Sequence, residues 1–203
     1  KPTYVYPDYL SYENNARTVF NSGNQYRRFN TSNLHNMPEQ TRSVVMSNDF
    51  YVVKLSNDQR RNLYAYVNEQ DLFGEKIIYL ERDDRDVATE ADYVMVEFFL
   101  EWAPVMQNQD VYVLGAITDW NLEESNKMTY DFERKGYSLN LLLKQGYYDY
   151  IYAVREKGQS KADVAPIAGN FWETMNEYTI YLYLFNPTQN YNQLIGVKTV
   201  VSH

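Results

Sequence analysis

The stretch Gly146-Tyr147-Tyr148-Asp149-Tyr150-Ile151-Tyr152-Ala153 decides the fold class of this chain. It follows the turn signal Lys144-Gln145-Gly146, and tyrosine recurs at every second position from 148 to 152. A β-strand sends alternate side chains to opposite faces, so these tyrosines share one face while Ile151 and Ala153 share the other. The stretch therefore predicts a strand with a tyrosine-rich face and an aliphatic face.

Runs of the same kind recur along the whole chain. They are short, rich in Tyr, Val, Ile and Phe, and bounded by Asn, Asp, Gly and Pro, which is the pattern of strands and turns. No window sustains the period of about 3.6 residues that a helix requires. The sequence therefore predicts an all-β protein. Strands are expected near Thr18–Phe20, Gln25–Phe29, Val44–Met46, Tyr51–Leu55, Leu63–Val67, Lys76–Leu80, Asp92–Leu100, Val111–Ile117, Lys127–Tyr130, Tyr137–Leu143, Tyr147–Val154, Tyr178–Leu184 and Leu194–Val201.

The expected strand Tyr178–Leu184 also has an apolar face and a tyrosine-rich face. Its even-numbered positions share the apolar face, and Tyr181 and Tyr183 lie on the opposite one. Tyrosines of this kind have two interpretations: they pave a solvated sheet, or they form an aromatic docking surface. The second interpretation rests on the enrichment of tyrosine at protein interfaces.

A run of charged residues, Glu81-Arg82-Asp83-Asp84-Arg85-Asp86, suggests a linker between two domains. The second part contains seven expected strands in about 115 residues, which matches the size of an immunoglobulin-like sandwich. We therefore expect two β-sandwich domains in tandem, residues 1–88 and residues 89–203.

Composition excludes several classes of protein. The 203 residues include 19 Lys and Arg against 27 Asp and Glu, for a net charge of −8, and no cysteine. A phosphate-binding surface needs clustered basic residues, so nucleic acid is not an expected partner. Without cysteine the chain has no disulfide and no thiolate metal site. Its apolar runs fall short of the roughly 18–20 residues that span a bilayer as a helix, so we do not expect a membrane-spanning protein.

The sequence does not predict an enzyme. Its two histidines are His35, in an Asn-rich stretch, and the final residue His203, and neither lies beside a Gly-x-Ser-x-Gly motif. The glycine-rich motifs that cradle phosphates are absent as well. No cofactor is expected. Carboxylates at Asp83, Asp84, Asp86 and Glu90 miss the EF-hand spacing, so a solvated linker is the expectation and structural calcium is the alternative.

One motif in the second part resembles a known binding module. The strand and turn Asp110–Asn121 close on Trp120, and the Gly146–Tyr150 strand follows. This order resembles the early-set, glycogen-binding-like sandwich found beside amylase-type catalytic domains. The resemblance implies that Trp120 stacks on a sugar ring of an α-glucan, with Asn121 and Asp119 beside it for hydroxyl groups. Packing of Trp120 over the edge of the core is the alternative.

A longer resemblance covers about 180 residues and consists of several blocks in order. The blocks are Ser22–Asn30, Thr89–Val94, Gly115–Trp120, Lys127–Tyr130, Leu141–Tyr148, Gly169–Ile180 and Leu194–Val200. This order is similar to the type 9 secretion system plug protein family, which was first described only as a domain of unknown function.

The resemblance implies a non-enzymatic protein of Bacteroidota. In that family, a two-part β protein of the periplasm lies at the inner face of the outer membrane and closes the translocon barrel of the type 9 secretion system. Family members have about twice this length, so the resemblance also implies that the first sandwich is incomplete in this sequence, with unpaired strand edges.

Six residues are the expected contacts with the barrel or with a glycan. Trp120 and Asn121 lie at the turn, and Tyr181 and Tyr183 lie on the tyrosine-rich face of their strand. Phe171 and Trp172 lie in the long connection between residues 155 and 176. They are included because loops of that length are usually functional or disordered.

Overall fold

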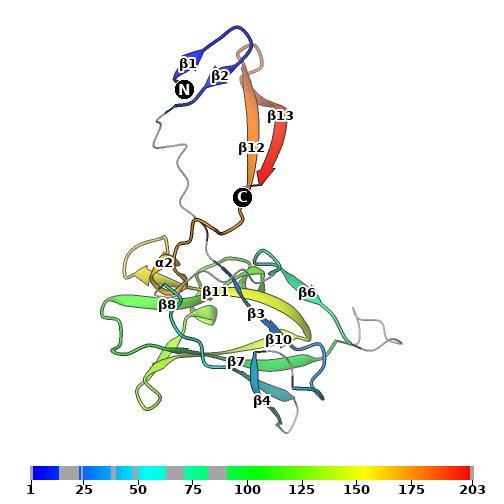
Figure 1. Cartoon of the computed structure of the whole chain (residues 1–203), viewed down its shortest axis with the longest axis vertical. Coiled ribbons are helices and arrows are strands. Elements are labelled where there is room, and N and C mark those ends of the chain that lie inside the picture. The colour runs from blue at the N-terminus through cyan, green and yellow to red at the C-terminus, as the bar shows by residue number, and fades with distance from the viewer. Residues whose placement is uncertain are drawn as a thin grey trace. The chain divides into compact units, whose positions relative to one another are not determined.

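The computed structural model describes residues 2–13, 23, 25–37, 40–47, 50–62, 71–81 and 91–201. Nearly all of its regular structure is β-strand (Figure 1), so the predicted all-β class is confirmed. The helical elements among these residues are single turns, α2 (Ala165–Ala168), η2 (Ala116–Thr118) and η3 (Glu124–Asn126). Within the described residues, no helix has the length and apolarity that crossing a membrane would require.

The chain forms two compact units, residues 24–169 and residues 1–23 together with 170–203. The larger unit is built on a five-stranded sheet with the order β4 (Thr41–Met46), β5 (Tyr51–Leu55), β7 (Tyr93–Glu101), β10 (Gly136–Lys144) and β9 (Thr129–Asp131). Its neighbours are antiparallel except for β5 and β7, which run parallel.

The second sheet of the larger unit is organised around β11 (Gly146–Glu156). The first half of β11 pairs with β3 (Arg27–Asn30) on one edge and with β6 (Lys76–Ile78) on the other. Its second half pairs with β8 (Gln109–Leu114). All of these pairs are antiparallel. Because β11 pairs with all three other strands, it is the central strand of this sheet.

The two-unit division does not coincide with a boundary near residue 88. Strands from before that residue pair with strands after it: β5 with β7, and β3 and β6 with β11. The charged run that begins at Glu81 therefore lies between two strands of one unit, β6 and β7. A charged connection between strands of a single sandwich has the same composition as an interdomain linker, which is why composition alone suggested a boundary here.

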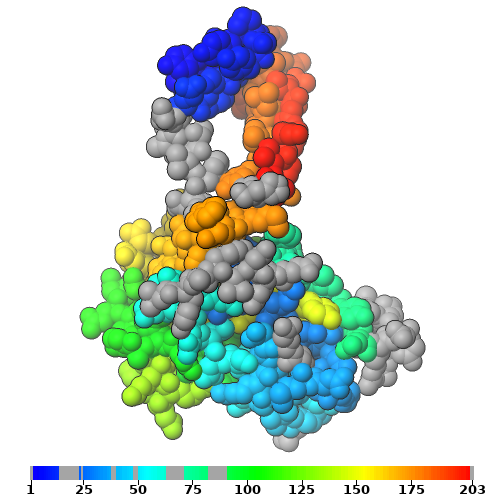
Figure 2. Space-filling model, in the orientation of Figure 1, coloured from blue at the N-terminus to red at the C-terminus, as the bar shows by residue number. Residues whose placement is uncertain are grey.

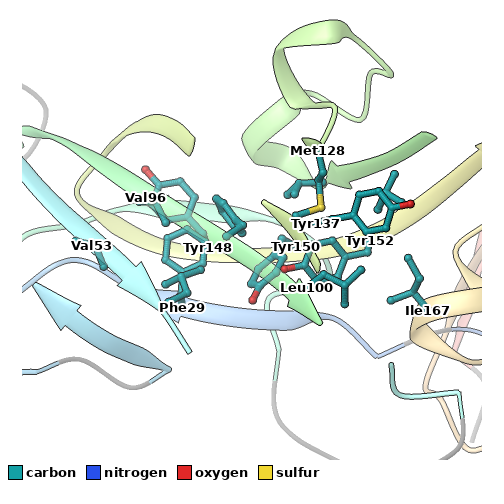
Figure 3. Close-up of a cluster of buried hydrophobic side chains, with 14 of the residues drawn as sticks. Phe29, Val53, Val96, Leu100, Met128, Tyr137, Tyr148, Tyr150, Tyr152 and Ile167 are labelled. Atoms are coloured by element: carbon teal, nitrogen blue, oxygen red, sulfur yellow. The ribbon is translucent and has the colours of Figure 1, made fainter. Parts of the chain in front are cut away.

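The tyrosines of β11 face the core of the larger unit. Tyr148, Tyr150 and Tyr152 are buried among aliphatic and aromatic side chains from both sheets (Figure 3). Phe29 stacks on Tyr148 with 5.1 Å between ring centroids, and Phe98 meets Tyr150 edge-on at 5.1 Å. The tyrosine-rich face of this strand is therefore the inner one, and neither interpretation of it as an outer surface holds.

The opposite face of β11 is covered as well. Ile151 and Ala153 pack in a second buried cluster with Tyr112, Leu114 and Ala168. Ala168 belongs to α2, which packs against β11. Because β11 is buried on both sides, its alternation separates two buried environments instead of an inner face and a solvated one.

A largely buried carboxylate, Asp58, with 13% of its side chain exposed, links the two sheets. Its Oδ1 accepts a hydrogen bond of 2.7 Å from the Arg27 guanidinium, and its Oδ2 accepts hydrogen bonds of 2.7 Å each from the hydroxyls of Tyr150 and Tyr152. Arg27 also donates to the carbonyl of Gln59 at 2.6 Å. Burial raises the pKa of both tyrosines well above the ordinary value, so their hydroxyls remain donors. The polar ends of the core tyrosines are thereby satisfied without water.

The described residues of the smaller unit form two hairpins. One is formed by β1 (Tyr4–Val5) and β2 (Leu10–Ser11), and the other by β12 (Glu177–Asn186) and β13 (Tyr191–Val201). Almost every side chain of β12 and β13 is exposed, and Figure 2 shows them in orange and red at the surface. The apolar face that the sequence predicts for β12 is not covered, because Ile180, Leu182 and Leu184 are all exposed. In the described residues, no further strand pairs with either edge of this hairpin.

Most predicted strands are present with shifts of a few residues at their ends. The expected strand Val111–Ile117 stops at Leu114, because Gly115 turns the chain into η2. Two expected strands, Thr18–Phe20 and Leu63–Val67, lie outside the described residues.

The Asp58 network predicts a large effect on stability. Replacing Asp58 by alanine removes the carboxylate that pairs with the buried Arg27 guanidinium and accepts from two tyrosine hydroxyls. We expect Asp58→Ala to lower the free energy of unfolding by about 3–5 kcal/mol, as is usual when one partner of a buried ion pair is removed. Denaturant titration followed by far-UV circular dichroism measures it. The control is Asp92→Ala, at an exposed side chain, which we expect to change stability by about 0.5 kcal/mol or less. Equal effects of the two substitutions would contradict the role assigned to Asp58.

Candidate functional site

The turn that carries Trp120 is fixed by close backbone contacts. Gly115 has a φ of 150°, and a side chain at this position would place its Cβ 2.7 Å from the carbonyl oxygen of Asp149. The N–H groups of Thr118 and Trp120 donate to the Gly115 carbonyl at 3.0 and 3.2 Å. Asp119 and Trp120 then adopt left-handed φ values of 48° and 59°. Such values are uncommon for residues other than glycine, so the surrounding contacts must hold the turn in this form.

The ring of Trp120 is partly packed against the protein. A Cβ on Gly74 would lie 2.6 Å from this ring, so the absence of a side chain at Gly74 makes room for the indole. Tyr26 meets the ring edge-on, with 5.9 Å between centroids. Trp120 nevertheless remains 44% exposed. The indole is therefore anchored along one edge and open to solvent elsewhere.

Asp149 holds the segment behind Trp120. Its side chain is fully buried and accepts hydrogen bonds from the backbone N–H groups of Leu72 and Gly74 and from Nε of Arg28. Burial raises the pKa of Asp149, and these three donors lower it in part. One feature of the sequence points to this residue, a charged side chain in the middle of a strand of buried type. Its partners cannot be predicted from the strand, because they are far away along the chain.

A small pocket lies beside the turn, and it includes Asn121 but not Trp120. The pocket has a volume of about 250 Å³, with Ile117 and the β10 residues Leu141, Leu142 and Leu143 on its apolar side. Its polar lining residues are Thr118, Asp119, Asn121, Glu123, Ser125 and Asn126. The two residues expected to act together on a sugar are thus consecutive in the turn but do not line one cavity.

Phe171 and Trp172 follow α2 in the long connection between β11 and β12. Phe171 pairs with Gly23 in an isolated β-bridge, and its N–H donates to the Gly23 carbonyl at 3.1 Å. Trp172 is 77% exposed. The connection itself is less irregular than the sequence suggested, because α2 buries Ile167 and Ala168.

Tyr181 and Tyr183 share one face of the hairpin and are 58% and 56% exposed. Their cross-strand partners are Val197 and Leu194, which are also exposed. The opposite face carries Ile180, Leu182 and Leu184. The predicted tyrosine-rich face is therefore present, but the hairpin presents apolar side chains on both of its faces.

The six expected contact residues form three local pairs. Trp120 and Asn121 belong to the larger unit, whereas Phe171, Trp172, Tyr181 and Tyr183 belong to the smaller unit. Among the described residues, no group of three His, Asp or Glu side chains could hold a metal ion. The calcium candidates Asp83, Asp84, Asp86 and Glu90 lie outside the described residues. His35 is exposed in a turn whose N–H groups donate to the Asn33 side chain.

Comparison with known proteins gives a structural likeness without a function. No protein-family model matches the chain, and no curated protein matches it. Among solved structures, the chain is similar to a hypothetical protein from Parabacteroides merdae ATCC 43184, with a TM-score of 0.91 and 36% sequence identity. The similarity covers 100% of this chain and 50% of that chain, so this chain spans half of the length of that protein.

The contact between Gly74 and Trp120 can be tested by a matched pair of substitutions. Gly74 and Gly158 have similar φ values, 80° and 87°, but a Cβ on Gly158 would have no neighbour within 4 Å. Alanine at either position carries the left-handed cost of roughly 1–2 kcal/mol. Gly74→Ala also pushes on the Trp120 ring, so we expect it to destabilise the protein by a further 1–3 kcal/mol, roughly the cost of overpacking.

Denaturant titration measures both substitutions, and the fluorescence of Trp120 provides a second readout. We expect a shift of the Trp120 emission to longer wavelength in Gly74→Ala only, because a displaced indole is more solvated. Equal stability losses and unchanged spectra would show that Gly74 does not position Trp120.

Proposed function

We propose that this protein is a non-enzymatic plug that binds the translocon barrel of the type 9 secretion system and closes it from the periplasmic side. The observation that carries the proposal is the β12–β13 hairpin, which exposes tyrosine, phenylalanine and aliphatic side chains on both faces. The ordered sequence blocks that resemble the plug family supply the identity of the partner.

The hairpin has the physical properties of a contact surface. A two-stranded hairpin is at best marginally stable in water when nothing covers it. Large exposed apolar patches usually mark sites of interaction, and most apolar side chains of β12 and β13 are exposed. Tyr181 and Tyr183 suit such a contact, because a tyrosine ring supplies apolar area while its hydroxyl still bonds to water or to a polar partner. The hairpin therefore gains stability when a partner covers it.

The length of the structural neighbour supports the proposal, because plug-family members are expected to have about twice the length of this chain. The neighbour comes from Parabacteroides merdae, and this chain corresponds to half of its length. The proposal concerns the full-length protein, and the experiment uses it.

Affinity purification tests the proposal directly. A tagged complete protein is purified from envelope extract of a strain that lacks the barrel's other partner, and mass spectrometry identifies what accompanies it. We expect to recover the translocon barrel in near-equal amount. Failure to recover the barrel, with the tagged protein folded and present in the envelope, would count decisively against a plug.

A double substitution in the hairpin tests whether β12 and β13 contact the barrel. Replacing Tyr181 and Tyr183 by threonine keeps the β-propensity of the strand and removes both rings. Aromatic side chains at the centre of an interface often contribute about 2 kcal/mol or more each, so we expect recovery of the barrel to fall by more than about tenfold. The control is Tyr93→Thr, at an exposed tyrosine of β7 in the larger unit, which should leave recovery unchanged. Equal recovery with all variants would remove the hairpin from the contact.

Binding of α-glucan at the Trp120 turn is the second candidate function. The half-exposed indole next to a polar-lined pocket favours it, whereas the packing of the ring on Gly74 and its absence from the pocket lining weigh against it. Titration with maltoheptaose at millimolar concentration separates the two functions. A glycan-binding module would show a fluorescence change that Trp120→Phe abolishes. A plug without glycan affinity would show no change in either protein.

A further inference from the structure

A second, larger pocket lies at one end of the five-stranded sheet of the larger unit. Four chain segments meet there: the beginning of β4, the residues after β5, the end of β7 and the turn before β10. The pocket has a volume of about 670 Å³ and is lined by Arg42, Asn57, Arg60, Phe99, Glu101, Trp102, Ala103, Pro104, Arg134 and Lys135. This volume is within the range of sites that hold small molecules.

The lining of this pocket is basic in a protein that is acidic overall. Its basic side chains are Arg42, Arg60, Arg134 and Lys135, and its acidic side chain is Glu101, whereas the whole chain has a net charge of −8. Within the described part of the chain, neither Arg60 nor Lys135 forms an ion pair. Uncompensated positive charge in a concave site creates a local potential that attracts anions.

Two of the guanidinium groups lie over aromatic rings. Arg60 lies over the ring of Trp102 at 4.8 Å from its centroid, and Arg134 lies over Phe99 at 3.7 Å. Arg134 also forms an ion pair of 2.8 Å with Glu97. Stacking occupies the faces of a guanidinium and leaves N–H groups at its edge for a carboxylate or phosphate. The arginines are thus oriented before any ligand arrives.

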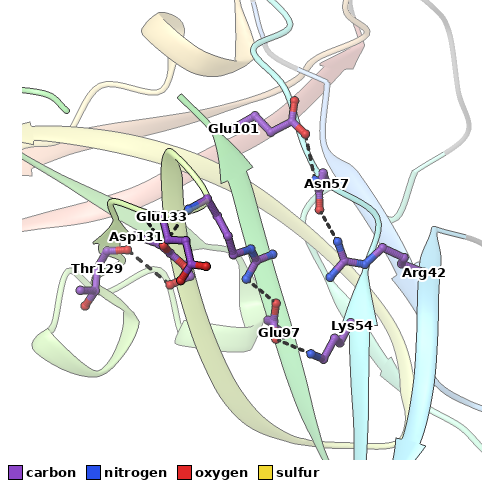
Figure 4. A network of polar contacts seen from close by, with 10 residues as sticks. Arg42, Lys54, Asn57, Glu97, Glu101, Thr129, Asp131 and Glu133 are labelled. Atoms are coloured by element: carbon purple, nitrogen blue, oxygen red, sulfur yellow. Dashed lines mark hydrogen bonds and ion pairs between the residues drawn. The ribbon is translucent and has the colours of Figure 1, made fainter. Parts of the chain in front are cut away.

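The acidic side chain of the pocket is held by amide groups. The side-chain amides of Asn57 and Gln59 donate to the two oxygens of Glu101 at 2.9 Å each. Asn57 in turn accepts a hydrogen bond of 3.1 Å from Arg42, so Asn57 lies between Arg42 and Glu101 (Figure 4). The hydrogen bonds from Asn57 and Gln59 lower the pKa of Glu101, which is therefore ionised at neutral pH. This carboxylate is bound by amides and leaves Arg60 and Lys135 unneutralised.

We propose that this pocket binds a small ligand that carries at least two oxyanion groups, held by Arg60, Arg134 and Lys135. Arg42 adds to the positive field from the opposite side of Asn57. The binding chemistry is charge-assisted hydrogen bonding from guanidinium and ammonium groups, which carboxylates and phosphates both accept. The proposal is independent of the contact with a translocon, since the residues belong to the larger unit and are remote in sequence from the hairpin.

Two probes distinguish the possible sources of the oxyanion. Citrate represents a polycarboxylate and inorganic pyrophosphate represents a phosphate, and each is titrated into the whole 203-residue chain by isothermal calorimetry at fixed ionic strength. The indole N–H resonance of Trp102 in nuclear magnetic resonance spectra reports where the probe binds. We expect saturable binding of at least one probe, accompanied by a shift of that resonance. The probe that binds more tightly identifies the class. Failure of both to bind would overturn the proposal.

Variants connect the binding to the pocket. We expect Arg60→Gln and Lys135→Gln each to weaken affinity by about tenfold, the usual effect of removing one hydrogen bond to a charged group. Glu101→Gln removes the repelling carboxylate and should strengthen affinity severalfold. The control, Lys161→Gln, makes the same charge change at an exposed lysine outside the pocket. Affinity that falls equally in the control, or that does not change with the pocket variants, would show nonspecific charge attraction and would refute the site.

Discussion

The larger unit depends on one carboxylate that joins its two sheets. Asp58 follows β5 and extends the first sheet, because its N–H donates to the Phe99 carbonyl and its carbonyl accepts from Glu101, both at 2.8 Å. Its side chain then meets Arg27 of β3 and Tyr150 and Tyr152 of β11, which belong to the second sheet. Hydrophobic burial alone would not fix which residues face each other across the core. The largely buried Asp58 carboxylate does fix them, because its three donors, one charged and two hydroxyl, would each carry a large desolvation penalty if they were left unpaired.

Tyrosine is the side chain that makes this arrangement workable. With 21 copies it is abundant in the chain, and in β11 it fills core volume with its ring while its hydroxyl reaches Asp58. The same residue type in β12 has the opposite environment, since Tyr181 and Tyr183 are exposed together with their aliphatic neighbours. The same alternation of tyrosine with other residues therefore occurs in the buried strand β11 and in the exposed strand β12.

The different burial of the tyrosines in β11 and β12 shows which features the sequence could predict and which it could not. Strand positions followed from the period of two residues, which is a local property. The surroundings of a strand are not a local property. Nothing within the sequence of β11 shows that both of its faces are covered. The polar run from Ser56 to Arg61 has the composition of a loop, although its Asp58 bonds to tyrosines more than 90 positions away. The same applies to the Trp120 turn. Its position was predictable, whereas its support by Gly74 and Asp149 required the fold. The basic pocket has no sequence motif because its side chains come from four separate segments.

The pairing of β3 with β11 has a consequence for how the protein folds. Thr31, directly after β3, donates to the carbonyl of Gly146 across a separation of 115 residues, and β11 then joins β6 and β8 into the same sheet. The strand that completes the second sheet is therefore among the last of this unit to leave the ribosome. Topologies dominated by such distant pairings fold slowly, because a long loop must close before any contact compensates its entropy. Until β11 docks, β3 and β6 have open edges and the core tyrosines are solvated. The larger unit must therefore pass through an interval during synthesis in which it is most prone to aggregation.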